Sequence, residues 1–351
     1  MNHMDKIAAQ LPEYGLDAML ITSDSGERYA LDFHGEGVLL IAREGARYIT
    51  DGRYIEAARE RVTGAEVCLA TAEKGHMELA KEYIQGRALH NVGFESGAMT
   101  VDGEKKYAQE LPCILTPAQK LLDGLRASKD PWEQDRIRQA QAITDESFRA
   151  ILNFIRPGMT EQEIAARLVY EMLSRGAERT SFDPIVAAGA NGSRPHAVPG
   201  ARVVEEGMFI TMDFGCKVGG YCSDMTRTVA LGHPTQEMEE VYAAVLAAQK
   251  AGIQAARAGV PGSEIDAAAR RMPAFSRPHR GSPSSVPQGS LSGRCPVKQQ
   301  VSFFCIRSPS LFFRPGRYST IRSLGERVMS SQPVSFRIST SSIRTPNRPG
   351  R

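Results

Sequence analysis

The sequence predicts an α+β protein of two domains, followed by a tail of different composition. The chain has 351 residues, which is enough for two domains of ordinary size. Short apolar runs typical of strands alternate with helical patterns as far as Arg271, and this mixture indicates both kinds of structure. Beyond that residue the composition changes abruptly. We therefore place an N-terminal α/β domain at 1–122, a second domain at 123–271 and a tail at 272–351.

The composition excludes several classes of protein. With 42% hydrophobic and 24% charged residues, the chain has an ordinary globular composition. No run approaches the roughly 18 apolar residues that a membrane span needs, so no membrane partner is expected. Charged residues interrupt the first 20 positions, which argues against a signal peptide. The six cysteines form no C-x-x-C pair, and a reducing cytoplasm is the location we expect.

The first domain is expected to hold a mixed sheet covered by helices. The apolar runs 18–21 and 38–41 have the composition of buried strands, and 48–50 is a strand that leads into a turn at Asp51-Gly52. Strand and helix patterns then alternate up to about Leu122, which favours a compact domain. The further elements expected there are a helix over 54–62, a strand over 67–70 and a helix over 78–84.

The second domain is expected to begin with two packed helices. An apolar stripe at spacings of three and four residues predicts a long helix that ends at Pro157-Gly158. Thr160 and Glu163 have the spacing of a capping box, which predicts the start of the next helix. That helix should stop at Gly176. The stripe of the long helix consists of Ile137, Ala140, Thr144, Phe148, Ile151 and Ile155.

Two aspartates lie on a predicted hairpin in the second domain. Residues 208–215 are a mostly apolar strand that we expect to be buried on both faces, and 221–229 is the return strand after Gly219-Gly220. If the loop spans 217–220, Asp213 and Asp224 face each other. Like charges directly opposite are destabilising, so the pair would share a proton or hold a cation. The alternative is that the register differs and one aspartate points to solvent.

His196 is a second candidate functional residue. It lies between Pro195 and Pro199 on a glycine-rich loop, and this restricted backbone suits a positioned polar group. The alternative interpretation is an ordinary histidine in a surface loop. The other histidines have less support from their neighbours.

Several motifs occur in a fixed order along the chain. In the second domain they are SFDPIV (181–186), AGAN (188–191), PHA (195–197), MDFG (212–215) and GYCSDMTRT (220–228). Nearer the N-terminus they are RY (28–29), FHG (33–35), TDGRY (50–54) and PGMTE (157–161). Over residues 1–271 the chain closely resembles the Xaa-Pro peptidases, metallopeptidases of family M24. The resemblance implies a creatinase-type N-terminal domain followed by a pita-bread catalytic domain.

The resemblance also implies an activity and residue roles. Asp213 would bind one metal ion and Asp224 would bridge two, which in this family are Mn²⁺, Co²⁺ or Zn²⁺. A hydroxide between the ions would attack the carbonyl of the bond before proline in a peptide. His196 corresponds to the histidine that contacts the substrate and stabilises the tetrahedral intermediate without binding metal. A homodimer is expected for an intact form, and aminopeptidase and dipeptidase activity both stay open.

The chain departs from the family after Arg271. The family's remaining ligands are a histidine in a Gly-His-Gly segment and two glutamates, and all three should follow that residue. The tail contains one histidine, His279, and one acid, Glu326, and neither lies in a matching context. The pita-bread domain is therefore incomplete. We expect the chain as written to be inactive or nearly so and its second domain to fold poorly.

The tail has two interpretations. Residues 272–351 hold Lys298 and twelve arginines, ten of the chain's 20 prolines and a single acid, a composition typical of a wrong reading frame. We favour a frameshift near codon 271. The rival is a real, disordered basic tail that binds nucleic acid through charge, but this does not explain the lost core strands, so no nucleic-acid partner is expected. If the tail is real, the alternative function is a non-catalytic pita-bread homologue that binds a peptide or another partner.

Overall fold

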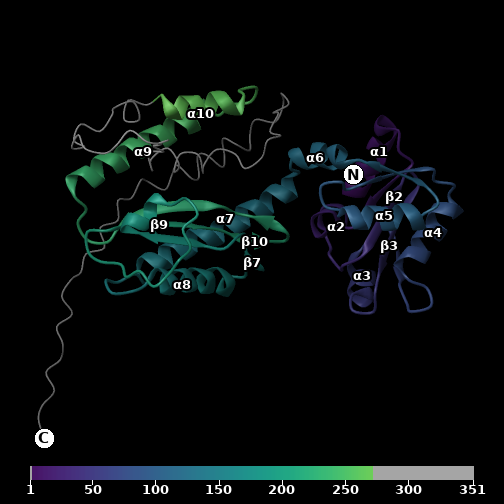
Figure 1. Ribbon diagram of the computed structural model, residues 1–351, viewed down its shortest axis with the longest axis horizontal. Helices are drawn as coiled ribbons and strands as arrows, with labels where there is room; N and C mark the ends of the chain where they lie inside the picture. Colours follow the sequence, from purple (N-terminus) through teal and green to yellow (C-terminus); the bar gives the residue numbers. More distant parts are fainter. Residues whose placement is uncertain (1, 272–351) are drawn as a thin grey trace, which may run out of the picture. The chain divides into compact units, whose positions relative to one another are not determined.

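The structure, a computed structural model, describes residues 2–271 (Figure 1). The chain divides into two compact units, Met1–Asp130 and the part that begins at Pro131. The sequence had placed this boundary at residue 122. No helix within the described residues is long and apolar enough to cross a membrane. The predictions for the tail, 272–351, lie outside the described residues.

The first unit is built on a six-stranded mixed sheet with the strand order β4-β3-β2-β1-β5-β6. The pairs β1–β2 and β2–β3 are antiparallel, whereas β1–β5, β3–β4 and β5–β6 are parallel. This confirms the predicted mixed sheet and the first four predicted strands. The strands are β1 (Ala18–Ile21), β2 (Val38–Ala42), β3 (Gly45–Thr50), β4 (Glu66–Leu69), β5 (Asn91–Phe94) and β6 (Ile114–Pro117). The α-helices are α1 (His3–Gln10), α2 (Asp24–Leu31), α3 (Ile55–Arg61), α4 (His76–Gly86), α5 (Val101–Glu110) and α6 (Gln119–Ala127).

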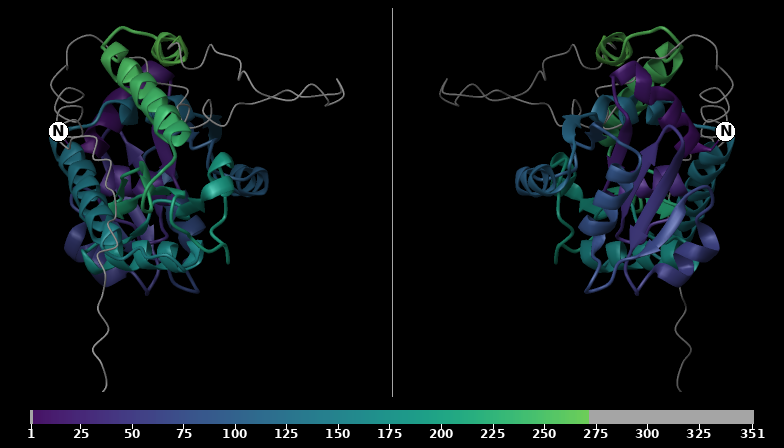
Figure 2. Two further views of the ribbon diagram at one scale, coloured as in Figure 1. Left: turned by 90° about the vertical axis from the view of Figure 1, so that its left-hand side faces the viewer. Right: turned by 90° about the vertical axis from the view of Figure 1, so that its right-hand side faces the viewer.

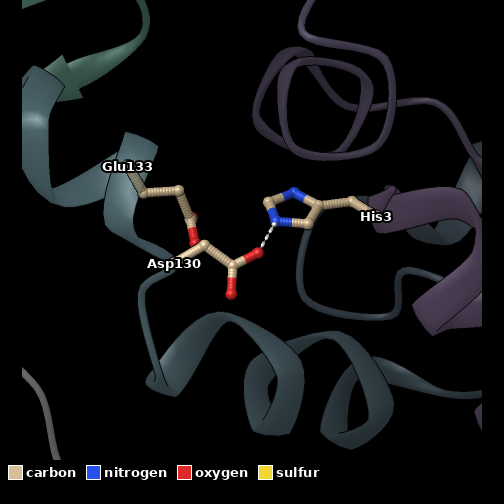
Figure 3. A group of neighbouring side chains, drawn as sticks. All are labelled: His3, Asp130 and Glu133. Carbon is tan, nitrogen blue, oxygen red and sulfur yellow. Dashed lines mark hydrogen bonds and ion pairs between the residues drawn. The ribbon is translucent and has the colours of Figure 1, made fainter. Parts of the chain in front are cut away.

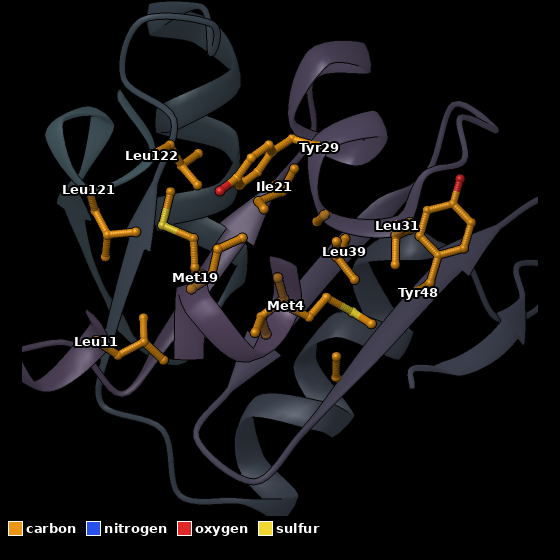
Figure 4. Packing of buried hydrophobic residues seen from close by; sticks show 14 of the residues in the cluster. Met4, Leu11, Met19, Ile21, Tyr29, Leu31, Leu39, Tyr48, Leu121 and Leu122 are labelled. Atoms are coloured by element: carbon orange, nitrogen blue, oxygen red, sulfur yellow. The ribbon is translucent and has the colours of Figure 1, made fainter. Parts of the chain in front are cut away.

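Both faces of this sheet are buried under helices, as Figure 2 shows. Because side chains alternate along a strand, Met19 and Ile21 of β1 point to one apolar core while Leu20 points to the other. The first core, drawn in Figure 4, includes side chains from α1, α2, α3 and α6. The second includes Tyr83 and Ile84 of α4. The continuous apolar runs of β1 and β2 follow from this double coverage.

His3 is a structural histidine of the first unit. Its side chain is buried, its ring stacks on Tyr29 with centroids 4.0 Å apart, and its Nδ1 lies 2.6 Å from the Tyr29 carbonyl oxygen. Its Nε2 lies 3.1 Å from Oδ2 of Asp130 (Figure 3). Asp130 also pairs with Lys6. These contacts hold α1 in place. Glu133, also drawn in Figure 3, belongs to the second unit, where it accepts a hydrogen bond from Tyr221 Oη at 2.7 Å.

Glu27 is a buried carboxylate that organises the chain between α2 and β3. Its oxygens accept hydrogen bonds from the backbone N–H groups of Gly35 (3.1 Å) and Gly37 (2.7 Å) and from Tyr48 Oη (3.1 Å). Only 1% of the residue is exposed, and burial raises the pKa of its carboxyl group. Donated hydrogen bonds are what makes such burial tolerable.

The second unit contains two small antiparallel sheets. One has the strand order β12-β9-β8 and the other β11-β10-β7. The strands are β7 (Arg179–Thr180), β8 (Ile185–Ala188), β9 (Phe209–Phe214), β10 (Cys216–Val218), β11 (Tyr221–Cys222) and β12 (Met225–Ala230). The α-helices are α7 (Pro131–Leu152), α8 (Glu161–Ser174), α9 (Gln236–Ala255) and α10 (Gly262–Arg270).

The helices α7 and α8 cover one face of the β12-β9-β8 sheet. Ala140 and Ile151 of α7 and Leu168 of α8 pack in one cluster with Met212 and Phe214 of β9. The capping box predicted at the start of α8 is confirmed, since Thr160 Oγ1 accepts from the backbone N–H of Glu163 and the Glu163 carboxylate accepts from that of Thr160. These contacts build the layer that the sequence predicted.

The other face of this sheet carries several polar side chains. Along β9, Thr211 and Asp213 alternate with the buried Met212 and Phe214, and they point away from the helices. Thr211 shares a hydrogen bond of 2.9 Å with Thr228 across the strands. The prediction that 208–215 is buried on both faces was therefore wrong for part of the strand, because Thr211 is half-buried. This second face carries the candidate site.

We predict that Glu27→Ala destabilises the first unit by about 3 kcal/mol or more, because three buried donors lose their acceptor. Urea denaturation followed by circular dichroism would measure the change. Glu13→Ala, which removes an exposed carboxylate from the same unit, is the matched control. Equal losses of stability in both variants would contradict the role given to Glu27.

Candidate active site

A two-residue turn sets the geometry of the hairpin that carries both aspartates. The strands β10 and β11 pair Val218 with Tyr221, so the turn consists of Gly219 and Gly220 alone. Both glycines have positive φ, 54° and 84°, which is the backbone of a type I′ turn. The predicted loop of 217–220 was therefore too long by two residues.

The shorter turn changes the partner of Asp213. In the β9–β12 ladder Asp213 lies opposite Thr226, so the prediction that it faces Asp224 directly was wrong. Because the register differs by an even number of residues, Asp224 still belongs to the same side of the hairpin, diagonal to Asp213. Asp213 is only 6% exposed, whereas Asp224 is exposed. One carboxylate therefore lies in the fold and the other at its surface.

Asp213 is a buried carboxylate whose negative charge is only partly compensated by its neighbours. Burial raises the pKa of Asp213 to about 6, and the charge of Asp224 and a hydrogen bond with the Asp224 carboxyl group act in the same direction. A hydrogen bond from Thr226 lowers the pKa and opposes these effects. Thr226 Oγ1 donates that bond to Oδ1 at 2.8 Å. The nearby His196 also lowers the pKa. The structure thus brings Asp213, Asp224 and His196 into one neighbourhood.

The backbone beside Asp224 is fixed by a buried hydroxyl network. Ser223 Oγ accepts from the backbone N–H of Cys216 at 3.0 Å and shares a hydrogen bond of 2.7 Å with Thr144 of α7. The Ser223 carbonyl accepts from Ser181 Oγ at 2.8 Å. Three segments of the unit therefore hold this part of the hairpin. Sequence reasoning missed these positioning contacts, because they join residues up to 79 positions apart.

Gly215 is required by the close approach of the two strands beside the aspartates. A Cβ atom at this position would lie 2.1 Å from the carbonyl oxygen of Ser223 and 3.2 Å from the Cα of Asp224. Neither backbone atom can move away without breaking the hairpin. The glycine that follows Asp213 and Phe214 is therefore a packing requirement of the site.

His196 lies on the loop after β8 and the short 3₁₀ helix η2 (Gly189–Ser193). Its side chain is exposed, while the following Ala197 is buried and donates its N–H to the carbonyl of Arg194 at 3.2 Å. The backbone beside the histidine is thus anchored and its ring faces solvent. This arrangement suits contact with a molecule that arrives from outside.

The donor set of the two aspartates matches part of a metal site. Carboxylate oxygens suit Mn²⁺ and also bind Zn²⁺, and a cation would offset the repulsion that Asp213 experiences. Among the described residues, however, no group of three His, Cys, Asp or Glu ligand atoms that all lie within 4.8 Å of one another includes Asp213 or Asp224. The described residues therefore fit a fragment of a metal site and do not complete one.

Comparisons with protein families and known proteins show which family the chain belongs to. Residues 135–282 match the model of metallopeptidase family M24, and residues 3–128 match the creatinase/prolidase N-terminal domain. The chain is 36% identical over 271 residues to the uncharacterized peptidase YqhT of Bacillus subtilis, covering 76% of each chain. It is 34% identical over 259 residues to a putative Xaa-Pro aminopeptidase of Mycoplasma genitalium, covering 72% of this chain and 71% of that protein.

Two solved structures extend the comparison to the fold. A Xaa-Pro dipeptidase from Bacillus anthracis superposes with a TM-score of 0.73 at 34% identity, over 76% of this chain and 75% of that one. An X-Pro aminopeptidase from Thermotoga maritima gives a TM-score of 0.69 at 32% identity, over 74% and 75% of the two chains. The predicted fold, a creatinase-type domain followed by a pita-bread domain, is thereby confirmed.

We predict that Asp213→Asn stabilises the metal-free protein at pH 8. The raised pKa means that folding favours the protonated carboxyl group, so its contribution to stability is full below pH 4 and is lost as the pH rises through about 6. The neutral amide avoids this loss, and we expect a gain of about 2 kcal/mol. Urea denaturation in the presence of a chelator measures it.

The same experiment at pH 4 should show little difference, because both side chains are then neutral. Asp183→Asn, which changes an exposed aspartate of the same unit, is the matched control and should have no comparable effect. A variant that is less stable than the original chain at pH 8 would contradict the electrostatic account of Asp213.

Proposed function

Because the chain belongs to metallopeptidase family M24, we propose that its site is built to hydrolyse the peptide bond before proline with the help of divalent metal ions. One observation carries the proposal. Asp213, Asp224 and His196 meet in one neighbourhood of a chain whose relatives include proteins named Xaa-Pro dipeptidase and X-Pro aminopeptidase. Proline-containing peptides are therefore the proposed substrates.

Each of the three residues has a proposed role that follows from its surroundings. Asp213 and Asp224 would hold the divalent ions, with Mn²⁺, Co²⁺ and Zn²⁺ as the candidates. When bound, such ions supply Lewis acidity and a nucleophile derived from water. His196, exposed beside the carboxylates, would donate a hydrogen bond to the oxygen on which negative charge develops. Thr226 would orient Asp213 through its 2.8 Å hydrogen bond.

The number of ligands limits what this chain can do. The two carboxylates of the described unit are fewer than a stable two-ion centre needs, and each missing ligand lowers the affinity for the ions. Beyond Arg271 the sequence offers one histidine, His279, and one acid, Glu326, both outside the described residues. We therefore propose that the chain as written has little or no peptidase activity.

This proposal predicts no robust hydrolysis by the purified 351-residue chain. Dipeptides that end in proline and tripeptides with proline second would be assayed with added Mn²⁺, Co²⁺ or Zn²⁺. The Xaa-Pro dipeptidase from Bacillus anthracis serves as the positive control. Turnover within tenfold of that enzyme, abolished by Asp213→Ala, would contradict the proposed inactivity and support the proposed reaction.

Measuring Mn²⁺ binding distinguishes a weak metal site in this chain from the absence of a metal site. We expect the chain to bind Mn²⁺ at least about 100-fold more weakly than the same control enzyme, because ligands are missing. We also expect Asp213→Ala to abolish the remaining specific binding. Isothermal titration calorimetry measures both. Binding that is unchanged in the variant would place the ion elsewhere and contradict the assignment of Asp213.

Sequencing the gene through codon 271 tests the origin of the missing ligands. If another frame encodes a Gly-His-Gly segment and two later glutamates, the corrected product should be an active Xaa-Pro peptidase. If the frame holds, the second candidate function applies, in which a non-catalytic homologue binds a peptide or another partner. The incomplete ligand set of the described unit is the observation that favours this second candidate.

The location and assembly of the protein are part of the proposal. Cys68, Cys113, Cys216 and Cys222 are free thiols, and this supports the proposed reducing cytoplasm. A homodimer is proposed for an intact form on the basis of the family resemblance. Neither nucleic acid nor membrane is proposed as a partner.

A further inference from the structure

Glu161 is a buried carboxylate that holds both ends of the loop carrying His196. The residue is the first of α8 and has no exposed surface. Its Oε1 accepts the backbone N–H of Ala188 at 2.8 Å, and its Oε2 accepts that of Gly200 at 3.2 Å. Asn191 Nδ2 donates to the two oxygens at 2.9 and 3.2 Å. The three donors lie 27 to 39 residues away in sequence.

From these contacts we infer that Glu161 is a positioning residue, which fixes the His196 loop relative to Asp213 and Asp224. The inference rests on the proposed function, because it assigns His196 a task beside the two aspartates. Glu161 does not touch the reacting groups. It acts through the backbone on either side of the histidine.

The start of the helix does not account for Glu161. The capping box of α8 is made by Thr160 and Glu163, and Thr160 Oγ1 accepts from the backbone N–H of Glu163. The N–H groups of Glu161 and Gln162 donate to the backbone carbonyls of Arg202 and Gly200, so the first turn does not need the Glu161 carboxylate as an acceptor. A fully buried carboxylate is costly unless donors surround it, and its donors here are the loop's own backbone and Asn191. The positive end of the helix dipole further favours a negative charge at this position.

The loop is connected to the aspartates through the sheet. Ala188, at one end of the loop, pairs with Ile210 of β9, and the same ladder pairs Ile185 with Asp213. At the other end, the backbone N–H of Gln162 donates to the carbonyl of Gly200 at 3.1 Å. Glu161 therefore joins the far end of the loop to the strand pair that contains Asp213. His196 lies on the loop between these two ends, Ala188 and Gly200, whose backbone is held in place.

The test compares Glu161→Gln with Glu163→Gln in the full-length chain. Glutamine keeps the size of the side chain but replaces one acceptor oxygen by an amide that itself donates, so a loop donor loses its partner. We expect amide exchange of Ala188 and Gly200 to become at least tenfold faster in Glu161→Gln. Glu163→Gln also alters the first turn of α8 but should leave both amides unchanged.

A second readout reports the place of the histidine. In protein labelled at histidine Cε1, Mn²⁺ added to the original chain should broaden the His196 signal, assigned with His196→Gln. At equal Mn²⁺ occupancy we expect Glu161→Gln to reduce this broadening at least twofold, and Glu163→Gln to leave it unchanged. Asn191→Ala removes a single donor and should give a smaller change of the same kind, which keeps the test open if Glu161→Gln does not fold.

The outcomes distinguish this inference from the proposed function. If Mn²⁺ does not broaden the His196 signal in the original chain, the proposed metal site fails, and amide exchange alone decides the role of Glu161. Unchanged exchange in both Glu161→Gln and Asn191→Ala would overturn the inference. Equal effects of Glu161→Gln and Glu163→Gln would also overturn it, because fraying of the helix would then explain them.

Discussion

Buried carboxylates need hydrogen-bond donors, and this requirement is the constraint on which the structure depends. Glu27, Glu95 and Glu161 are three of the four described glutamates that are at most 2% exposed, and each of the three accepts hydrogen bonds from backbone N–H groups and from neutral side chains. Each thereby ties together segments that are distant in sequence. Asp213 is treated differently, since it accepts from the hydroxyl of Thr226 and lies beside a second carboxylate. The glutamates hold the fold, whereas burial and the neighbouring Asp224 raise the pKa of the Asp213 carboxyl group despite the opposing effects of Thr226 and His196.

The elements that could be predicted from the sequence are those with local causes. The strands of the first unit follow from short apolar runs, and the start of α8 follows from the spacing of Thr160 and Glu163. The neighbourhood of Asp213, Asp224 and His196 was expected from a turn signal and a family resemblance. The register was not, because a Gly-Gly pair fits both a two-residue turn and the end of a longer loop. Because the predicted loop was too long by two residues, Asp224 was placed on the correct side of the hairpin but was wrongly paired with Asp213.

The contacts that position the site could not be predicted, because their partners are remote. Nothing near Thr144 in the sequence indicates that its hydroxyl meets Ser223, and the stripe on α7 gave it an ordinary place in an apolar layer. Glu161 appeared as one acid among several at a helix start, yet its partners are Ala188, Asn191 and Gly200. The comparisons do not identify these contacts either, since they align the chain with about three quarters of each relative and do not say which side chains are in contact.

Gly215 has a consequence for how this chain can vary through evolution. The space where a side chain would begin is already taken by the Ser223 carbonyl, so a mutation there disturbs the backbone beside Asp224 before any change in chemistry can be selected. Selection for folding and selection for catalysis therefore act on this codon in the same direction. A descendant that no longer uses its aspartates would still keep Gly215. Conservation of this glycine in a lineage is therefore evidence that the hairpin is retained and is not evidence of activity.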